Sequence, residues 1–271
     1  MSESPEVAGH YSAHYGQFAD EVHGQVRKAA FGEDIGQNSW LTRDELSRFA
    51  RWLGLGRSSR LLDVACGSGG PALHLVRLTG CEIVGVELYE EAVATANRIA
   101  VEAGLEPRAR FVQADASTPL PFEDGGFDAI LCVDAINHLA GRQRLLTDWA
   151  RLLTAGGRLL FTDPLIVTGM LGSDEIAART SIGYGLFAPL GENERVLAET
   201  GLQVVTVEDT TESMAAIALR RYRAREQYEE KLRETEGDDT FEGRQRFFDV
   251  AAILSGERRL SRYVYVAVKP S

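Results

Sequence analysis

Residues 61–70, with the sequence LLDVACGSGG, constrain the fold of this chain more than any other segment. An apolar run there contains Asp63 and is followed by three closely spaced glycines. Glycine adopts positive φ readily and lets the backbone approach a ligand with no Cβ in the way. A second apolar run ends at Glu87. A strand, a glycine turn, a helix and an acidic strand tip predict the nucleotide-binding half of a doubly wound α/β fold.

Short apolar runs alternate with helical stretches in the segment 56–163. Strands are expected at 60–65, 82–88, 109–114, 127–133 and 157–163, with helices at about 71–79, 90–103 and 141–154. Near-continuous Val, Ile and Leu are typical of parallel strands covered on both faces. After Pro164 the pattern predicts a helix at 191–200, a strand at 202–210, helices at 213–236 and 241–255, and a final strand.

Composition excludes several classes of protein. The 29 basic residues are outnumbered by 40 acidic ones, giving a net charge of −11, which argues against binding to nucleic acid. The three cysteines, Cys66, Cys81 and Cys132, lack the spacing of metal ligands, so we expect reduced thiols and no metal. No secretory signal is recognisable and no apolar run approaches about 18 residues, so we expect a cytoplasmic protein with no membrane partner.

The glycine turn alone does not identify the nucleotide, because residues 67–72 also fit the dinucleotide pattern G-x-G-x-x-G/A. A carboxylate at Asp63 would repel a pyrophosphate but could pair with a ligand ammonium group. Asp115 closes the third expected strand and could accept the exocyclic amine of an adenine, while Ala116 leaves room for the ring. These features favour an adenosyl ligand with an ammonium group. A dinucleotide oxidoreductase stays as the alternative.

Five segments in order resemble the class I S-adenosylmethionine-dependent methyltransferases: DVACGSGG, VEL, QADA, FDAILCVDAINHL and LLTAGGRLLFTD. The resemblance implies S-adenosylmethionine as cofactor and a Rossmann-like, doubly wound, mostly parallel seven-stranded sheet whose last strand is antiparallel. It assigns cofactor contacts to Asp63, Ala65, Gly67, Gly69, Glu87, Leu88, Asp115, Ala116, Val133 and Asp134. Glu87 would bind the ribose hydroxyls, and Leu88 would stack on adenine.

A narrower resemblance covers residues 32–41, GEDIGQNSWL, which are similar to a segment of the sarcosine/dimethylglycine and ubiquinone-type methyltransferases. The similarity weakens after Ile35, so it indicates a lid over the cofactor and not a particular acceptor. It adds Gln37 and Trp40 to the expected cofactor contacts, with Tyr11 and Tyr15 from the preceding segment. Aromatic faces can stabilise a sulfonium cation.

His138 follows the fourth strand at the carboxyl edge of the sheet, where doubly wound folds bind ligands. It is the candidate general base or acceptor contact, and a packing role is the alternative. Further candidate acceptor contacts are His14, Asp163, Tyr184, Phe187 and Tyr222. We interpret His23 as a solvated helix residue. Arginines 220, 221, 223 and 225 precede glutamates at helical spacing, which predicts a salt-bridged solvent face.

The sequence therefore predicts a methyltransferase acting on a nitrogen or oxygen of a small-molecule metabolite. The acidic composition slightly favours a cationic or amine acceptor. A C-methyltransferase of a quinone or secondary-metabolite pathway, or a non-catalytic binding protein for the cofactor, stay as alternatives. We expect a homodimer and the following organisation: a helical arm or lid (1–55), a cofactor-binding core (56–163), an acceptor-site region and helical cap (164–259, including strand 202–210), and the last strand (260–271).

Overall fold

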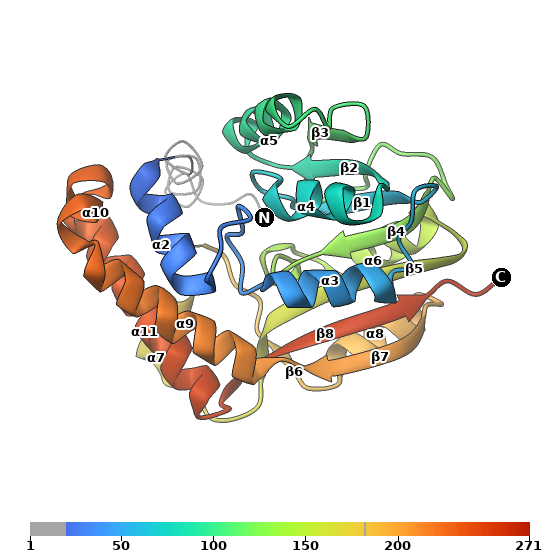
Figure 1. The fold of residues 1–271 in the computed structure, drawn as a ribbon. Helices are drawn as coiled ribbons and strands as arrows, with labels where there is room; N and C mark the ends of the chain where they lie inside the picture. Colours follow the sequence, from blue (N-terminus) through green and yellow to red (C-terminus); the bar gives the residue numbers. More distant parts are fainter. Residues whose placement is uncertain (1–19, 182) are drawn as a thin grey trace.

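The computed structural model describes residues 20–181 and 183–271. Its sheet has the order β3-β2-β1-β4-β5-β8-β7, and a short β6 pairs with β5 (Figure 1). The strands are β1 (Arg60–Val64), β2 (Glu82–Glu87), β3 (Ala109–Gln113), β4 (Phe127–Cys132), β5 (Leu153–Val167), β6 (Ala188–Pro189), β7 (Gln203–Asp209) and β8 (Leu260–Val268). Strands β1 to β5 pair in parallel, whereas β8 is antiparallel to both β5 and β7. The α/β fold with an antiparallel last strand is confirmed.

Successive residues of a strand point to opposite faces of the sheet, and helices cover both faces. Leu61 of β1 packs with α3 (Arg43–Trp52), α4 (Gly70–Thr79) and α5 (Glu90–Glu102). Its neighbour Leu62 packs on the other side with α6 (Arg142–Leu152) and α8 (Glu192–Glu199). The near-continuous apolar strands therefore contribute side chains to two hydrophobic cores, one on each face of the sheet.

A separate group of helices stands beside the carboxyl ends of the parallel strands (Figure 1). We call it the cap: α2 (Glu21–Phe31), α7 (Ser173–Arg179), α9 (Thr211–Gln227), α10 (Glu229–Glu236) and α11 (Asp238–Gly256). Val22 and Val26 of α2 pack against Ala224 and Leu232. Segments from opposite ends of the chain therefore meet in the cap.

Some element boundaries differ from the expected ones. The helix expected at 213–236 is divided at Tyr228, whose φ of −113° and ψ of 21° are not helical. Strand β5 begins at Leu153, well before the expected 157, because that residue pairs with Phe127 of β4. The same strand continues past Pro164, where its register with β8 shifts. Proline has no N–H to donate to the ladder, which accounts for this irregularity.

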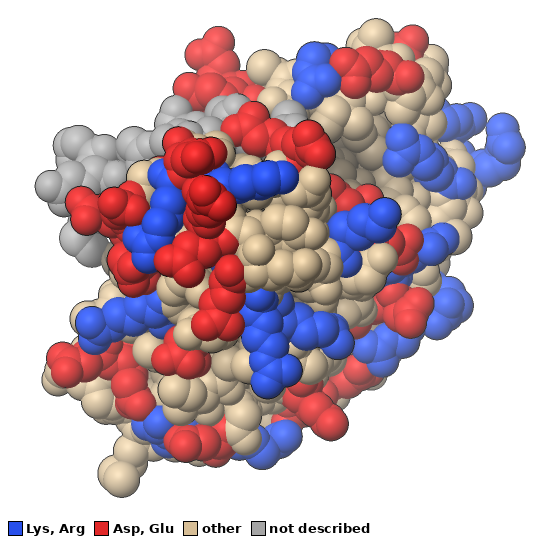
Figure 2. Space-filling view, turned by 60° about the vertical axis from the view of Figure 1, so that its left-hand side comes forward, with Lys and Arg blue, Asp and Glu red and all other residues tan. Residues whose placement is uncertain are grey.

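The outer face of the cap carries acidic and basic side chains next to one another (Figure 2). In the described part of the chain, no helix is both long and apolar enough to cross a membrane.

Candidate active site

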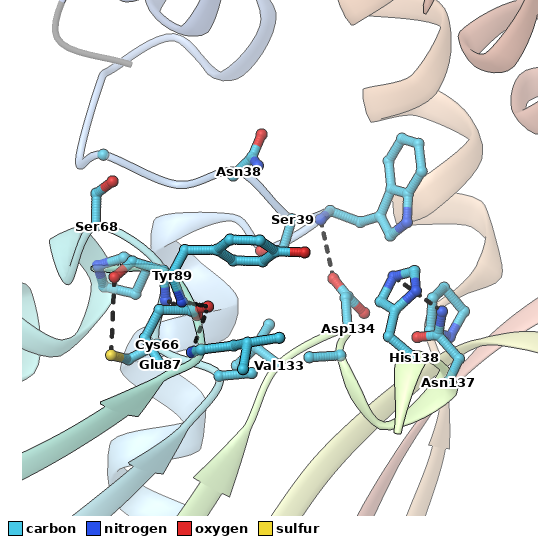
Figure 3. Close-up of a pocket in the computed structure, with 18 of the residues that line it drawn as sticks. Asn38, Ser39, Cys66, Ser68, Glu87, Tyr89, Val133, Asp134, Asn137 and His138 are labelled. Carbon is cyan, nitrogen blue, oxygen red and sulfur yellow. Dashed lines mark hydrogen bonds between the residues drawn. The ribbon is translucent and has the colours of Figure 1, made fainter. Parts of the chain in front are cut away.

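A pocket lies between the carboxyl ends of the central strands and the cap, and Figure 3 shows part of its lining. Most of the expected cofactor contacts line it: Trp40, Asp63, Ala65, Gly67, Glu87, Leu88, Asp115, Ala116, Val133 and Asp134. Gln37 and Gly69 are not among its lining residues. Tyr11, Tyr15 and His14 lie outside the described residues. The sequence motifs thus converge on one cavity.

The glycine turn after β1 forms the floor of the pocket. Ala65 and Gly67 both have a φ of 55°. Gly69, with a φ of 75°, packs so closely that a Cβ would come within 2.8 Å of both the Ala96 Cβ and the Phe111 ring. Ser68 lines the pocket, and its buried hydroxyl has no hydrogen-bond partner among the described residues. The turn therefore presents a polar atom to a ligand.

The loop before α3 lies directly on this turn. A Cβ at Gly70 would be only 2.2 Å from the carbonyl oxygen of Ile35 and 2.7 Å from the Cα of Gly36. Gln37 is buried and braces the loop, since its Oε1 accepts a hydrogen bond from the Ile35 N–H at 2.9 Å. The structure therefore gives Gln37 a supporting position behind the pocket lining.

Glu87 is held at the tip of β2 by backbone groups. Its carboxylate accepts hydrogen bonds from the N–H groups of Gly67 at 2.9 Å, Leu88 at 2.8 Å and Tyr89 at 3.3 Å. The side chain of Tyr89, which sequence analysis did not single out, lies beside Glu87 (Figure 3). Asp115 is similarly fixed by the Ser117 N–H at 2.8 Å.

Asp63 is buried near Glu87 on the pocket floor. Burial and the negative charge of Glu87 raise the pKa of Asp63 to about 8. Both causes favour the neutral carboxylic acid. A cation bound in the pocket would reverse this preference, so the position suits the ammonium group of a ligand.

Asp134 lines the pocket, but its carboxylate is engaged by other parts of the protein. It accepts hydrogen bonds from the Trp40 N–H at 2.9 Å, the Thr162 hydroxyl at 2.7 Å and the Arg262 Nε at 2.7 Å. Arg262 is fully buried and also pairs with Glu45 at 2.6 Å. Asp134 therefore fixes the loop that carries Trp40 over the pocket.

His138 ends the short 3₁₀ helix η1 (Ile136–His138) and lines the pocket. Its Nδ1 bonds to the backbone carbonyl of Tyr184, and its Nε2 lies 3.2 Å from the Asn137 Nδ2 (Figure 3). The carbonyl can only accept, so Nδ1 carries the proton and the lone pair is on Nε2. Nε2 then accepts the hydrogen bond from the Asn137 amide, so it can take a proton from a substrate only when that amide moves away.

Four expected acceptor contacts do not line the pocket. Asp163 is fully buried in an ion pair with Arg142 at 2.8 Å, so the interpretation of this carboxylate as an acceptor contact is wrong. Tyr184 is on the surface, with 36% of its area exposed. Phe187 packs in an apolar cluster with Leu165, Leu254 and Leu260. The Tyr222 hydroxyl is paired with Glu226, which raises its pKa.

The cap contributes a cationic end to the pocket. Its lining residues there include Arg27, Arg179, Arg221, Arg225 and Arg244. The predicted solvent face is therefore wrong for Arg221 and Arg225, although Arg220 and Arg223 on the same helix are exposed. The sequence did contain a signal for the buried position of these two arginines. Arg221 and Arg225 have i, i+4 spacing and share a helix face with the apolar residues Ile217 and Ala218.

His23 also differs from its expected solvated position. It is buried in α2 and lines the cationic end of the pocket. Burial, followed by the positive charge of Arg244, lowers the pKa of His23 to about 4. The imidazole is therefore neutral at physiological pH.

Comparison with known proteins identifies the family. Residues 62–161 match a family model described as a methyltransferase domain. The 27-O-demethylrifamycin SV methyltransferase of Amycolatopsis mediterranei (strain S699) is 31% identical over 210 residues, which are 73% of this chain and 75% of the relative. The chain belongs to the S-adenosylmethionine-dependent methyltransferases.

Two further similarities are to methyltransferases whose names give a small-molecule substrate. Sarcosine/dimethylglycine N-methyltransferase of Halorhodospira halochloris is 32% identical over 133 residues, 49% of this chain and 47% of the relative. A solved structure of a Haemonchus contortus phosphoethanolamine N-methyltransferase, in complex with phosphomonomethylethanolamine and S-adenosylhomocysteine, has a TM-score of 0.80 at 22% identity. The similarity covers 94% of this chain and 58% of that one, and shows the shared fold.

The cofactor of this methyltransferase is S-adenosylmethionine, and the pocket residues fit its chemical groups. Asp63 and the Ser68 hydroxyl, which has no hydrogen-bond partner among the described residues, both line the pocket and could bind the charged groups of an amino acid. Glu87 presents a carboxylate at a strand tip, where it can accept hydrogen bonds from two adjacent hydroxyls. Family membership thus favours an adenosyl ligand over the dinucleotide.

Proposed function

We propose that this methyltransferase binds the cofactor over the glycine turn and methylates a nitrogen or oxygen atom of a small metabolite held under the cap. S-adenosylmethionine supplies a methyl group on a sulfonium centre. The observation that carries the proposal is a single pocket, lined at one side by the acidic strand tips and at the other by the cap helices. The two ligands would then meet where strand and cap residues face each other.

The roles of the protein follow from this arrangement. Asp63 and Glu87 orient the cofactor, and the loop held by Asp134 excludes water above it. Alignment and desolvation of two reactants are worth effective molarities of roughly 10⁵ to 10⁸ M. A hydroxyl acceptor needs a base, and His138 is the candidate: the Tyr184 carbonyl holds Nδ1, and the acceptor hydroxyl would replace the Asn137 amide at Nε2. A carbon acid would need the same base, so a C-methyltransferase stays as the second candidate.

The test combines calorimetry with an activity screen. We expect S-adenosylhomocysteine to bind the purified protein. We also expect the protein to convert S-adenosylmethionine to S-adenosylhomocysteine in the presence of at least one member of a panel of amines, phenols and carboxylic acids. Failure to bind the cofactor product would contradict the proposed site. Binding without release in any reaction would favour a non-catalytic binding protein.

We also propose a cytoplasmic homodimer. All three cysteines are buried free thiols, as suits a reducing compartment. Strand β7 is at the edge of the sheet and exposes Val205 and Val207, which could meet the same strand of a second copy. Light scattering after size-exclusion chromatography measures the mass, and a monomer at micromolar concentration would contradict the dimer.

A further inference from the structure

Charge is divided unequally within the pocket. The acidic lining residues are Asp63, Glu87, Asp115 and Asp134, and all of them are at or just beyond the ends of β1 to β4. The five arginines come instead from four cap helices. Of the lining residues contributed by the described cap helices, none is an aspartate or glutamate. The end of the pocket beneath the cap is therefore cationic.

Several of these arginines have acidic partners behind the pocket. Arg225 and Arg244 share the buried carboxylate of Glu236, with Arg244 at 2.9 Å. Arg27 pairs with Asp34 at 2.8 Å. These pairs compensate part of the positive charge and hold α2, α9 and α11 in place.

Arg221 is different. It donates hydrogen bonds to the backbone carbonyls of Asn38 at 3.1 Å and Ser39 at 3.3 Å. Within residues 20–181 and 183–271, no aspartate or glutamate forms an ion pair with its guanidinium. Burial, together with Arg225, Arg244 and Arg27, lowers the pKa of Arg221 to about 9. A positive charge in these surroundings would be stabilised by an anion.

Aromatic rings lie close to two of the guanidinium groups. Arg221 lies 4.4 Å from the ring centre of Phe248, and Arg179 lies 4.3 Å from that of Phe247. Both groups are 5.7 Å from the Trp40 ring. A cation over an aromatic face is attracted by the ring, so these contacts hold both guanidinium groups at the cap end of the pocket. The bonds to Asn38 and Ser39 use part of the five N–H donors of Arg221, and the remaining donors can bind a planar or tetrahedral oxyanion.

We propose, on the basis of the proposed function, that the methyl acceptor carries an oxyanion group, a carboxylate or a phosphate, and that Arg221 binds this group with Arg179 beside it. The anion anchors the acceptor at the cap end of the pocket and leaves its nucleophilic atom to face the strand tips. This replaces the expectation of a cationic acceptor, which rested on the net charge of the whole chain. The local charge of the pocket has the opposite sign.

The test uses simple anions as probes of the protein saturated with S-adenosylhomocysteine. Benzoate, inorganic phosphate and the neutral isostere benzamide are compared by calorimetry and thermal unfolding at constant ionic strength. We expect benzoate, phosphate or both to bind and benzamide not to bind. Binding of benzoate alone indicates a carboxylate acceptor, and binding of phosphate alone indicates a phosphorylated one.

Variants of Arg221 test whether the anion binds to this residue. We expect Arg221→Gln to weaken anion binding by about 10- to 100-fold, the loss typical of a charge-assisted hydrogen bond. Arg223→Gln, on the exposed side of the same helix, is the matched control and should bind anions like the wild type. Arg221→Lys keeps the positive charge without the planar guanidinium. It should bind anions with an affinity between those of the wild type and Arg221→Gln, and it replaces the glutamine variant if that variant does not fold.

Two outcomes would overturn the inference. Either no anion binds the wild type although S-adenosylhomocysteine does, or Arg221→Gln binds anions as tightly as Arg223→Gln. The affinity for S-adenosylhomocysteine, measured in the same samples, separates the two proposals. If that affinity is lost in the wild type, the proposed function fails; if it is retained without anion binding, only the inference fails.

Discussion

The carboxylate of Asp134 accepts a hydrogen bond from the backbone N–H of Trp40, 94 positions earlier in the chain, at 2.9 Å. Asp134 follows β4 with a positive φ of 52°, and the same carboxylate binds the buried Arg262. The loop that carries Trp40, the tip of β4 and strand β8 therefore meet at one side chain. A local change there affects the architecture of the site as a whole.

Asp134→Ala should lower the free energy of unfolding by about 3–5 kcal/mol, because it removes a partner of a buried arginine and leaves the Trp40 N–H unsatisfied. Urea unfolding measures the change. Glu102→Ala is the control, since it breaks an exposed i, i+4 pair with Arg98 that should contribute less than about 1 kcal/mol. Equal losses in both variants would contradict the importance of Asp134.

Glu87→Gln should weaken S-adenosylhomocysteine binding by about 1–3 kcal/mol, since an amide cannot replace both acceptor oxygens of the carboxylate. Calorimetry measures the dissociation constant. Glu82→Gln is the matched control, because that glutamate is exposed at the opposite end of β2. The placement of the ribose at Glu87 would be wrong if the two variants bound the ligand equally well.

Asp63 makes stability depend on pH. Burial and Glu87 raise its pKa from 3.8 to about 8, so between these values the native state holds a proton that the unfolded chain has lost. Because the native state binds more protons, this residue makes the free energy of unfolding fall as pH rises from about 4 to 8. Asp63→Asn should remove that contribution. Urea unfolding at pH 5, 7 and 9 compares the two proteins, and parallel pH profiles would refute the shift.

His138→Gln should reduce turnover by about 10²- to 10⁴-fold with a hydroxyl acceptor, the usual contribution of a general base. Binding of S-adenosylhomocysteine should stay unchanged, because the imidazole is expected to face the acceptor. Single-turnover rates across a pH series measure the effect with an acceptor found in the screen. A variant with near-normal turnover would assign His138 to packing.

The core of the fold was predictable because its signals are local. The apolar strands, the glycine turn at Gly67 and the acidic tip at Glu87 can be found without knowledge of their neighbours. The same local information placed most cofactor contacts around one pocket, because parallel strands end at the same edge of a sheet. Their individual roles stay predictions.

The cap end of the pocket was not predictable in this way. Helical spacing alone gave Arg225 an exposed glutamate partner, whereas in the structure it pairs with the buried Glu236 of α10. The break at Tyr228 turns α10 back toward α2 and α11, and no local pattern encodes that contact. Asp163 was misplaced for the same reason, since Arg142 and Asn193 bind it from two other helices.

The close contact between Gly70 and Ile35 bears on how this enzyme could be engineered. With a Cβ at position 70 only 2.2 Å from the Ile35 carbonyl, any larger residue there would push the overlying loop outward and open the cleft to solvent. Mutagenesis aimed at new acceptors should therefore leave this position unchanged. Substitutions on α7, α9 and α11 offer a route to altered acceptor selectivity that leaves the glycine turn and the acidic strand tips unchanged.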